Sequence, residues 1–84
     1  MDKILFFSKN NCTACPQAKA KVKQLKNYEI EYIDVSTEEG KDAIEKYSLL
    51  SVPTVIEVDE NNNEIKRHVG LSAINVFVNF KNNK

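Results

Sequence analysis

Short apolar runs alternate with amphipathic stretches along the chain. Residues 3–8 contain four consecutive apolar side chains, which is typical of a strand buried on both faces of a sheet. In residues 13–26 the apolar positions recur at spacings of three and four, which predicts an amphipathic helix. Residues 30–35 predict a second strand. Two strands joined through a helix should be parallel, with a right-handed crossover.

The middle of the chain predicts a second helix and then a hairpin. Residues 36–39 resemble a helix cap and lead into a short helix that reaches residue 47. Residues 52–58 and 64–69 predict two strands. The segment between them is rich in asparagine, which tolerates turn conformations, so these strands are expected to be antiparallel.

A last helix is predicted near the C-terminus, with Ser72 as its cap and one apolar face. Phe77 and Phe80 are expected in or near the core, and residues 81–84 are expected to fray. The predicted order is β-α-β-α-β-β-α. It indicates an α/β fold in which three helices flank a four-stranded mixed sheet. With 84 residues, we expect one domain that spans residues 1–84.

Composition narrows the function classes. Twelve basic and twelve acidic residues cancel, so no overall field favours nucleic acid or an anionic membrane. The N-terminal apolar run is too short for a signal-peptide core, and no stretch approaches the ~20 apolar residues of a membrane span. We therefore expect a cytoplasmic protein, and we expect it to be a monomer.

The only two cysteines stand in the segment Cys12-Thr13-Ala14-Cys15, directly after the first predicted strand. This spacing occurs in redox-active disulfides, in haem attachment sites and in metal sites. Haem attachment would need histidine after Cys15, where this chain has Pro16. Structural zinc needs four ligands, and two cysteines with one distant histidine do not supply them. In a reducing cytosol, a close cysteine pair is more often catalytic or metal-binding than structural.

Residues 6–16 resemble the active-site segment of small thioredoxins and glutaredoxins. Val52-Pro53-Thr54 resembles the cis-proline segment of the same superfamily, and Val69-Gly70-Leu71-Ser72 resembles the thioredoxin segment before the last helix. The resemblance covers the whole chain and is strongest to short archaeal and anaerobe proteins. It implies the thioredoxin-like fold and a dithiol–disulfide oxidoreductase, with no cofactor other than the reversible Cys12–Cys15 disulfide and with no metal.

The resemblance also implies a role for each site residue. Cys12, near a helix start that favours its thiolate, is expected to be the nucleophile, and Cys15 the resolving thiol. A cis Val52–Pro53 bond would leave the Val52 backbone free to pair with an extended substrate. Pro53 would then pack against the disulfide. The residues expected to bind substrate are Val52, Pro53, Thr54 and Gly70.

Lys9 matches a lysine that glutaredoxins place beside the thiolate, so an electrostatic role and a solvated loop position are both open. Two family features are missing. Gly70-Leu71-Ser72-Ala73 replaces the glutathione clamp of glutaredoxins, and Phe6 stands where thioredoxins carry a buried aspartate. His68 is expected to be a half-buried strand residue without a catalytic role.

Three alternatives remain: a glutathione-dependent glutaredoxin, a copper-chaperone domain with a metal-binding C-x-x-C loop, and an iron–sulfur cluster bridging two monomers. The chaperone fold has the order β-α-β-β-α-β, which the predicted elements do not match. The missing clamp favours a flavin-dependent reductase of the thioredoxin reductase type as electron donor. The expected substrates are oxidised protein disulfides, with ribonucleotide reductase or peroxidases as examples.

Overall fold

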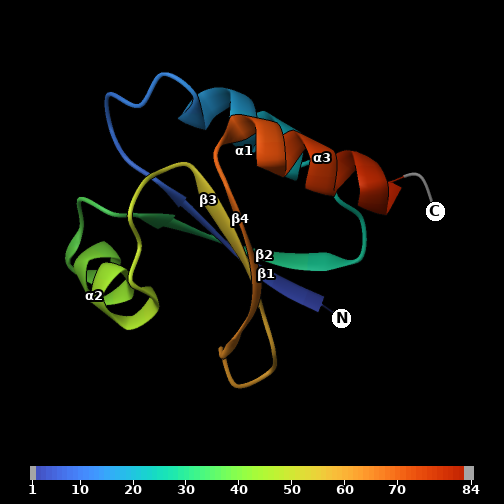
Figure 1. Cartoon of the computed structure of the whole chain (residues 1–84). Helices are drawn as coiled ribbons and strands as arrows, with labels where there is room; N and C mark the ends of the chain where they lie inside the picture. The colour runs from blue at the N-terminus through green and yellow to red at the C-terminus, as the bar shows by residue number, and fades with distance from the viewer. Residues whose placement is uncertain (1, 83–84) are drawn as a thin grey trace.

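A computed structural model describes residues 2–82 (Figure 1). The predicted order of helices and strands is confirmed. The elements are β1 (Asp2–Ser8), α1 (Cys15–Val22), β2 (Tyr28–Asp34), α2 (Glu38–Tyr47), β3 (Thr54–Val58), β4 (Glu64–Val69) and α3 (Leu71–Asn82).

The four strands form one mixed sheet in the order β2-β1-β3-β4. β1 pairs with β2 in parallel and with β3 antiparallel, and β3 pairs with β4 antiparallel. In this register Phe7, near the end of β1, lies opposite Thr54, at the start of β3. The segment that follows β1 and the segment that precedes β3 therefore lie at the same edge of the sheet.

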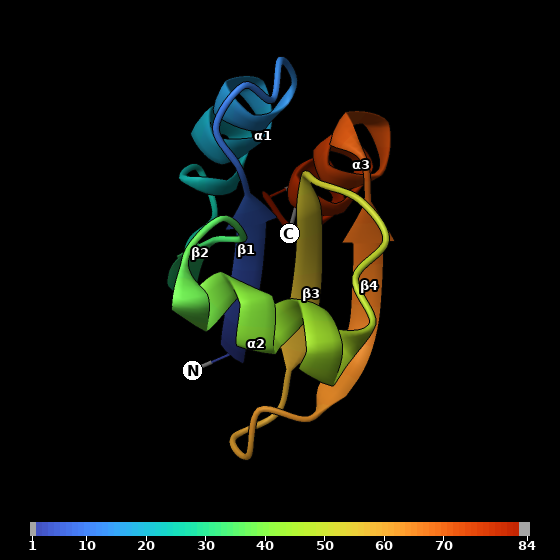
Figure 2. The same cartoon turned by 90° about the vertical axis from the view of Figure 1, so that its left-hand side faces the viewer.

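Helices cover both faces of the sheet, as predicted. α1 and α3 lie side by side on one face, and α2 lies on the other (Figures 1 and 2). Alternating residues of β1 supply both cores: Ile4 and Phe6 pack under α1 and α3, while Leu5 and Phe7 pack under α2. All four are at most 3% exposed. This double burial accounts for the uninterrupted apolar run in the sequence.

The first helix is shorter than predicted. It begins at Cys15 rather than Thr13, with Pro16 in its first turn, a position where a missing N–H costs little. It ends at Val22 rather than near residue 26. Leu25 stays buried because tighter turns continue the chain, including a bond from the Leu25 N–H to the Val22 carbonyl. The helix-like spacing of apolar residues therefore continues past the end of α1, into turns that are not α-helical.

The start of α2 is capped as the sequence predicts. The side-chain oxygen of Thr37 accepts a hydrogen bond from the Gly40 N–H at 3.0 Å. The hydroxyl of Thr37 also donates to the Asp34 carbonyl at 2.7 Å, which ties the helix to the end of β2.

The C-terminal helix departs from prediction at two points. Phe80 is 60% exposed, because the buried face of α3 is formed by Ile74, Phe77 and Val78. The helix extends to residue 82, beyond the predicted end of the ordered helix at residue 80, while residues 83–84 lie outside the described part. Within residues 2–82, no helix is both long enough and apolar enough to cross a membrane.

Three carboxylates make the fold sensitive to acid. The pKa of Asp34 is lowered because the Ser36 side chain and N–H donate to its carboxylate. Backbone N–H groups of its own turn lower the pKa of Asp59, and the Arg67 guanidinium lowers that of Glu64. A carboxyl group whose pKa is lowered by folding stabilises the fold at pH values above its unfolded-state pKa of about 4. This contribution is lost as the pH falls through the folded-state pKa.

We therefore expect the urea midpoint of unfolding to fall between pH 5 and pH 3 after little change between pH 7 and pH 5. Glu64→Gln should show a smaller fall, because this variant has already lost the ionised carboxylate at neutral pH. Each group is at least partly exposed, so each contribution is small. Equal midpoints at pH 7 and pH 3 would contradict this account.

Candidate active site

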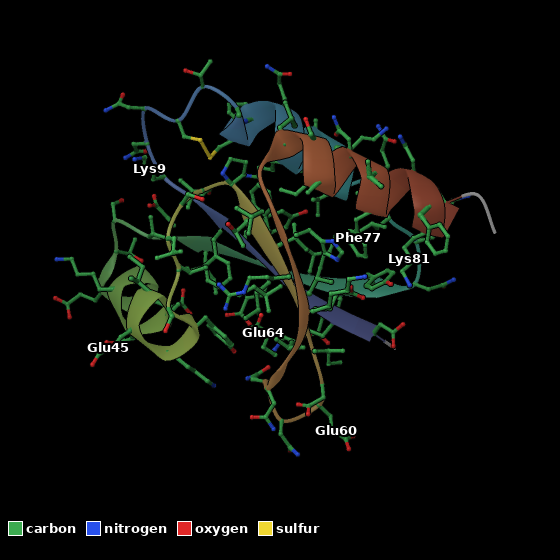
Figure 3. The ribbon with its side chains drawn as sticks, in the orientation of Figure 1. Lys9, Glu45, Glu60, Glu64, Phe77 and Lys81 are labelled. Carbon is green, nitrogen blue, oxygen red and sulfur yellow. A yellow bond between two sulfur atoms is a disulfide. The ribbon has the colours of Figure 1, made fainter. Side chains whose placement is uncertain are left out.

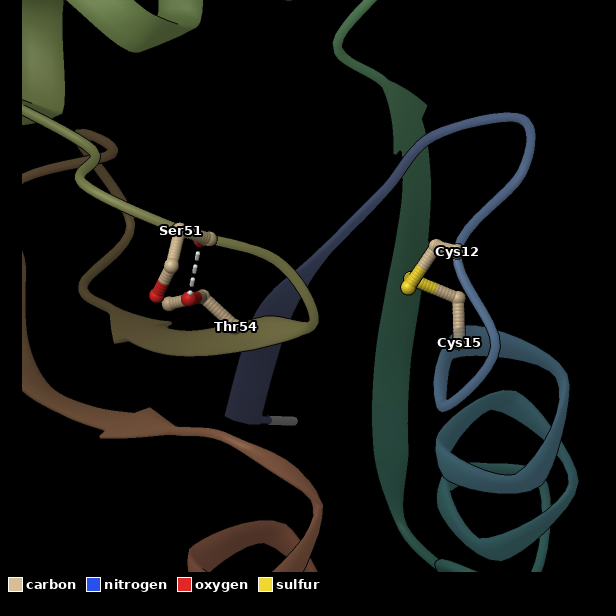
Figure 4. The surroundings of a disulfide bond; sticks show 4 residues. All are labelled: Cys12, Cys15, Ser51 and Thr54. Atoms are coloured by element: carbon tan, nitrogen blue, oxygen red, sulfur yellow. Dashed lines mark hydrogen bonds between the residues drawn. A yellow bond between two sulfur atoms is a disulfide. The ribbon is translucent and has the colours of Figure 1, made fainter.

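The two cysteines form a disulfide at the edge of the sheet where β1 ends (Figures 3 and 4). After Ser8 the chain turns through a polar loop in which Asn11 has a φ of 64°, a left-handed conformation that asparagine tolerates better than most residues. Cys12 follows this turn, and Cys15 is the first residue of α1. Their Cα atoms are 5.4 Å apart, within the usual range for a disulfide.

The two sulfur-bearing residues differ in exposure. Cys15 is 4% exposed and shares the buried face of α1 with Ala18 and Val22. Cys12 precedes the helix and is partly exposed. An incoming disulfide can therefore reach Cys12 first, while Cys15 is shielded behind it.

Because α1 starts later than predicted, its dipole stabilises a Cys12 thiolate less than expected. Cys12 lies three residues before the helix rather than directly before it, and the helix dipole weakens quickly beyond the first turn. Its carbonyl nevertheless accepts the N–H of Cys15 at 3.3 Å, which holds the loop onto the helix.

A surface pocket of about 630 Å³ adjoins both cysteines. Its charged lining residues are Lys9 and Lys19, and no carboxylate lines it. Lys9 lies close to the disulfide in Figure 3. Positive charge beside a thiol favours its thiolate, so both lysines suit a reactive cysteine.

Lys19 was not singled out from the sequence, where it is one of several charges on the helix surface. A signal was available, because Lys19 follows Cys15 by one helical turn and so lies on the same side of α1. Its ammonium group also lies 5.2 Å from the centroid of the Tyr32 ring, which helps to position it.

The segment before β3 lies at the same edge of the sheet as the disulfide. The Val52–Pro53 peptide bond is cis, as the resemblance implies. The Thr54 hydroxyl donates to the Ser51 carbonyl at 2.8 Å (Figure 4), and the Gly70 N–H donates to the Pro53 carbonyl at 2.9 Å. Pro53 is buried and does not line the disulfide pocket, whose lining comes from the end of β1, the β1–α1 loop and α1.

The peptide groups of Val52 are available for pairing. Among residues 2–82, no hydrogen bond engages the N–H or C=O of Val52, although both neighbouring carbonyls, those of Ser51 and Pro53, accept one. Val52 is partly exposed, so its peptide groups can meet solvent or an extended chain.

Gly70 and His68 lie outside the lining of the disulfide pocket. Gly70 has a φ of 90°, a conformation that favours glycine, and it connects β4 to α3. The His68 ring lies 2.8 Å from the Glu57 carboxylate and stacks on Phe77 with ring centroids 4.2 Å apart. His68 is thus half-buried, as predicted, and it does not line the disulfide pocket.

The architecture does not match the copper-chaperone alternative. The element order β-α-β-α-β-β-α differs from the β-α-β-β-α-β order of the copper-chaperone domain, because α2 stands where that fold requires a strand. In the part of the chain described, no three His, Cys, Asp or Glu side chains are grouped as metal ligands.

Comparisons with solved structures agree with this architecture. Thioredoxin-2 of the malaria parasite superposes with a TM-score of 0.78 at 20% identity, covering 100% of this chain and 84% of that one. A mutant thioredoxin from Halobacterium salinarum gives 0.77 at 18% identity, covering 98% and 73%. Thioredoxin 1 from Thermosipho africanus gives 0.61 at 27% identity, covering 95% and 98%.

A comparison with curated proteins found no match. The family model for the glutaredoxin-like domain (DUF836) matches residues 3–79, which include both cysteines and the cis-proline segment. Together with the thioredoxin-like fold and the Cys12–Cys15 disulfide, this match supports a thiol–disulfide redox function in general terms. The chain belongs to the glutaredoxin-like domain family and is a small thioredoxin/glutaredoxin-like redox protein.

Proposed function

We propose that this protein is a dithiol–disulfide oxidoreductase that reduces disulfides in other proteins. The observation that carries the proposal is the Cys12–Cys15 disulfide at the end of the central strand, with Cys12 partly exposed and Cys15 buried. This asymmetry gives the two thiols different tasks in the exchange reaction.

In the reduced protein, the Cys12 thiolate attacks one sulfur of the substrate disulfide. A Cys12–substrate disulfide forms, and the other substrate sulfur leaves as a thiolate that takes up a proton. The Cys15 thiolate, formed by loss of its own proton, then attacks the Cys12 sulfur and expels the second substrate thiolate. Two electrons pass from the protein to the substrate, which leaves two substrate thiols and the Cys12–Cys15 disulfide.

Substrate positioning falls to the segment before β3. The unpaired N–H and C=O of Val52 can form strand-like hydrogen bonds with an extended peptide, while Pro53 and Thr54 hold the segment in place. Gly70 contributes by bonding to the Pro53 carbonyl. Lys9 and Lys19 favour the attacking thiolate by their charge.

The electron donor we infer is a flavin-dependent reductase rather than glutathione. The first turn of α3, where a glutathione clamp would supply an acidic group, contains no acidic residue. The substrates we infer are oxidised cytoplasmic proteins, with ribonucleotide reductase and peroxidases as candidates, and we infer that the protein works as a monomer without a further cofactor.

Reduction of insulin tests the activity and the donor together. Catalytic amounts of protein are supplied either with NADPH and thioredoxin reductase or with NADPH, glutathione and glutathione reductase, and insulin precipitation is followed. We expect precipitation at least ~10-fold faster with thioredoxin reductase, a difference of about 1.4 kcal/mol in barrier. Faster reduction with glutathione would overturn the inferred donor, and no acceleration by either the enzymatically or the dithiothreitol-reduced protein would overturn the proposed activity.

A further inference from the structure

Helix α3 carries an apolar row beside the face that it buries. The row consists of Ala73, Val76, Phe77 and Phe80, whose spacing of i, i+3, i+4 and i+7 places them along one side of a helix. Of the four, only Phe77 is buried in the core, whereas Val76 is 69% exposed and Phe80 is 60% exposed. Single exposed apolar residues are ordinary, but residues grouped in this way mark a site of interaction.

The row lines a groove between α3 and β4. The groove has a volume of about 650 Å³, and Ile65 of β4, which is 67% exposed, also lines it. Two of its lining residues, Phe77 and Lys81, are labelled in Figure 3, where they lie apart from Lys9 and the disulfide. The groove shares no lining residue with the disulfide pocket, so the redox chemistry does not account for it.

The charged groups of the groove leave an excess of positive charge. Lys66 and Lys81 line it, and in the described part of the chain neither forms an ion pair with a carboxylate. The Lys81 ammonium nitrogen lies 5.8 Å from the centroid of the Phe80 ring. The only carboxylate in the lining belongs to Glu57, and it already accepts a hydrogen bond from the His68 ring at 2.8 Å. The groove therefore favours an anionic group.

The charges of β4 disfavour a second copy of the chain as the occupant. β4 is an edge strand, so its outer side could pair with another strand. In a two-fold symmetric pairing centred on Lys66 and Arg67, these residues would face each other or their own copies. Like charges placed opposite one another destabilise a strand pair, and basic residues protect edge strands from such pairing. A symmetric dimer through β4 is therefore disfavoured.

The volume and lining indicate the class of ligand. Small-molecule sites usually enclose ~300–1,000 Å³ and combine apolar walls with a few polar groups that orient the ligand. The groove has about 650 Å³ and two ammonium groups beside its apolar walls. An apolar body placed there would cover the exposed parts of Ile65, Val76 and Phe80. A carboxylate at one end can accept charge-assisted hydrogen bonds from Lys66 and Lys81.

We propose that the groove between α3 and β4 binds a small amphipathic carboxylate, such as a medium-chain fatty acid. Its head group lies at Lys66 and Lys81, and its apolar body lies along the exposed row of α3. The site does not depend on the oxidoreductase function, because it lies outside the disulfide pocket. It gives the protein a ligand that the cysteine chemistry does not require.

Titration of the isotope-labelled, oxidised protein with decanoate, kept below its micelle concentration and followed by NMR, tests the site. We expect saturable shifts at the residues that line the groove. Decyltrimethylammonium has the same tail with a cationic head, and we expect it to bind at least ~10-fold more weakly. Equal affinities for the two probes, or no saturable shift in the groove, would overturn the proposal.

Two variants separate the contributions of the head and the tail. Lys81→Glu should weaken decanoate binding about 10-fold, because a cation is replaced by a like charge. Val76→Asp should weaken it by about as much, because it places a carboxylate among the apolar walls, and Val76 is exposed enough for the fold to tolerate the change. An unchanged affinity in both variants would contradict the assigned site.

Lys41→Glu is the matched control, since Lys41 is an exposed lysine of α2, on the opposite face of the sheet. It changes the net charge as Lys81→Glu does and should keep the affinity of the unchanged protein. A loss as large as that in Lys81→Glu would mean that net charge alone attracts decanoate. Sedimentation tests the other occupant: self-association through α3 and β4 that decanoate does not reverse would assign the groove to a second copy and overturn the proposal.

Discussion

Cys12→Ser is expected to reduce insulin disulfides no faster than the uncatalysed reaction, whereas Cys15→Ser should accumulate as a covalent complex with its substrate. The serine hydroxyl is not ionised at neutral pH and cannot form a disulfide, so the first attack is lost in Cys12→Ser. In Cys15→Ser that attack still occurs, but no second thiol releases the substrate. Insulin precipitation measures the first effect, and non-reducing electrophoresis with mass spectrometry measures the second.

The double variant Cys12→Ser, Cys15→Ser is the control for both, because it removes all thiols from the chain. It should show neither catalysis nor complexes. Circular dichroism should give the same helix content for all three variants, since serine is close to cysteine in size and Cys15, though buried, is only the first residue of α1. Substrate complexes formed by Cys12→Ser, and not by Cys15→Ser, would reverse the assignment of nucleophile and resolving thiol.

The fold was predictable because most helices and strands are marked by signals within their own stretch of sequence. The apolar run of β1, the turn between β3 and β4, and the Thr37 cap are local signals, and each corresponds to an observed element. The start of α1 was predicted two residues too early, at Thr13, although Pro16 marks it, since proline is favoured in the first turn of a helix. The exposure of Phe80 depends on how α3 lies across the sheet, which local spacing does not determine.

The candidate site was predictable where its residues are close in sequence or are brought together by strand pairing. Cys12 and Cys15 are adjacent in sequence, and the pairing of β1 with β3 brings the Val52–Pro53 segment to the same edge. An apolar hollow of about 170 Å³ beside Leu50 could not be found in this way. It forms where the loop after β2, the end of α2 and the cis-proline segment meet, and these contacts depend on tertiary packing.

At Gly40, α2 lies directly against the backbone at the end of β2. A Cβ atom at this position would lie 2.1 Å from the Asp34 carbonyl oxygen and 2.4 Å from the Val35 Cα. Both are backbone atoms, which cannot rotate away as a flexible side chain can. The helix would have to move off the end of β2, and the bonds from Thr37 to Asp34 and from Gly40 to Thr37 would be strained with it.

Gly40→Ala is therefore expected to destabilise the fold, although helix propensity alone predicts the opposite. Alanine is favoured over glycine within a helix by about 1 kcal/mol. Overpacking costs about 1–3 kcal/mol and occasionally more, and contacts this short with backbone belong at the upper end. We expect a net loss of about 2 kcal/mol in the free energy of unfolding, measured with urea, and a melting temperature lower by about 10 °C.

Glu45→Ala in the same helix is the matched control, because Glu45 is exposed and its replacement changes propensity without adding a contact. It should stay within about 0.5 kcal/mol of the unchanged protein. The sign of the Gly40→Ala effect decides between the two physical accounts. A variant stabilised by about 1 kcal/mol would mean that α2 shifts freely and that propensity prevails. A destabilised variant would mean that the close packing of α2 on the end of β2 requires glycine at position 40.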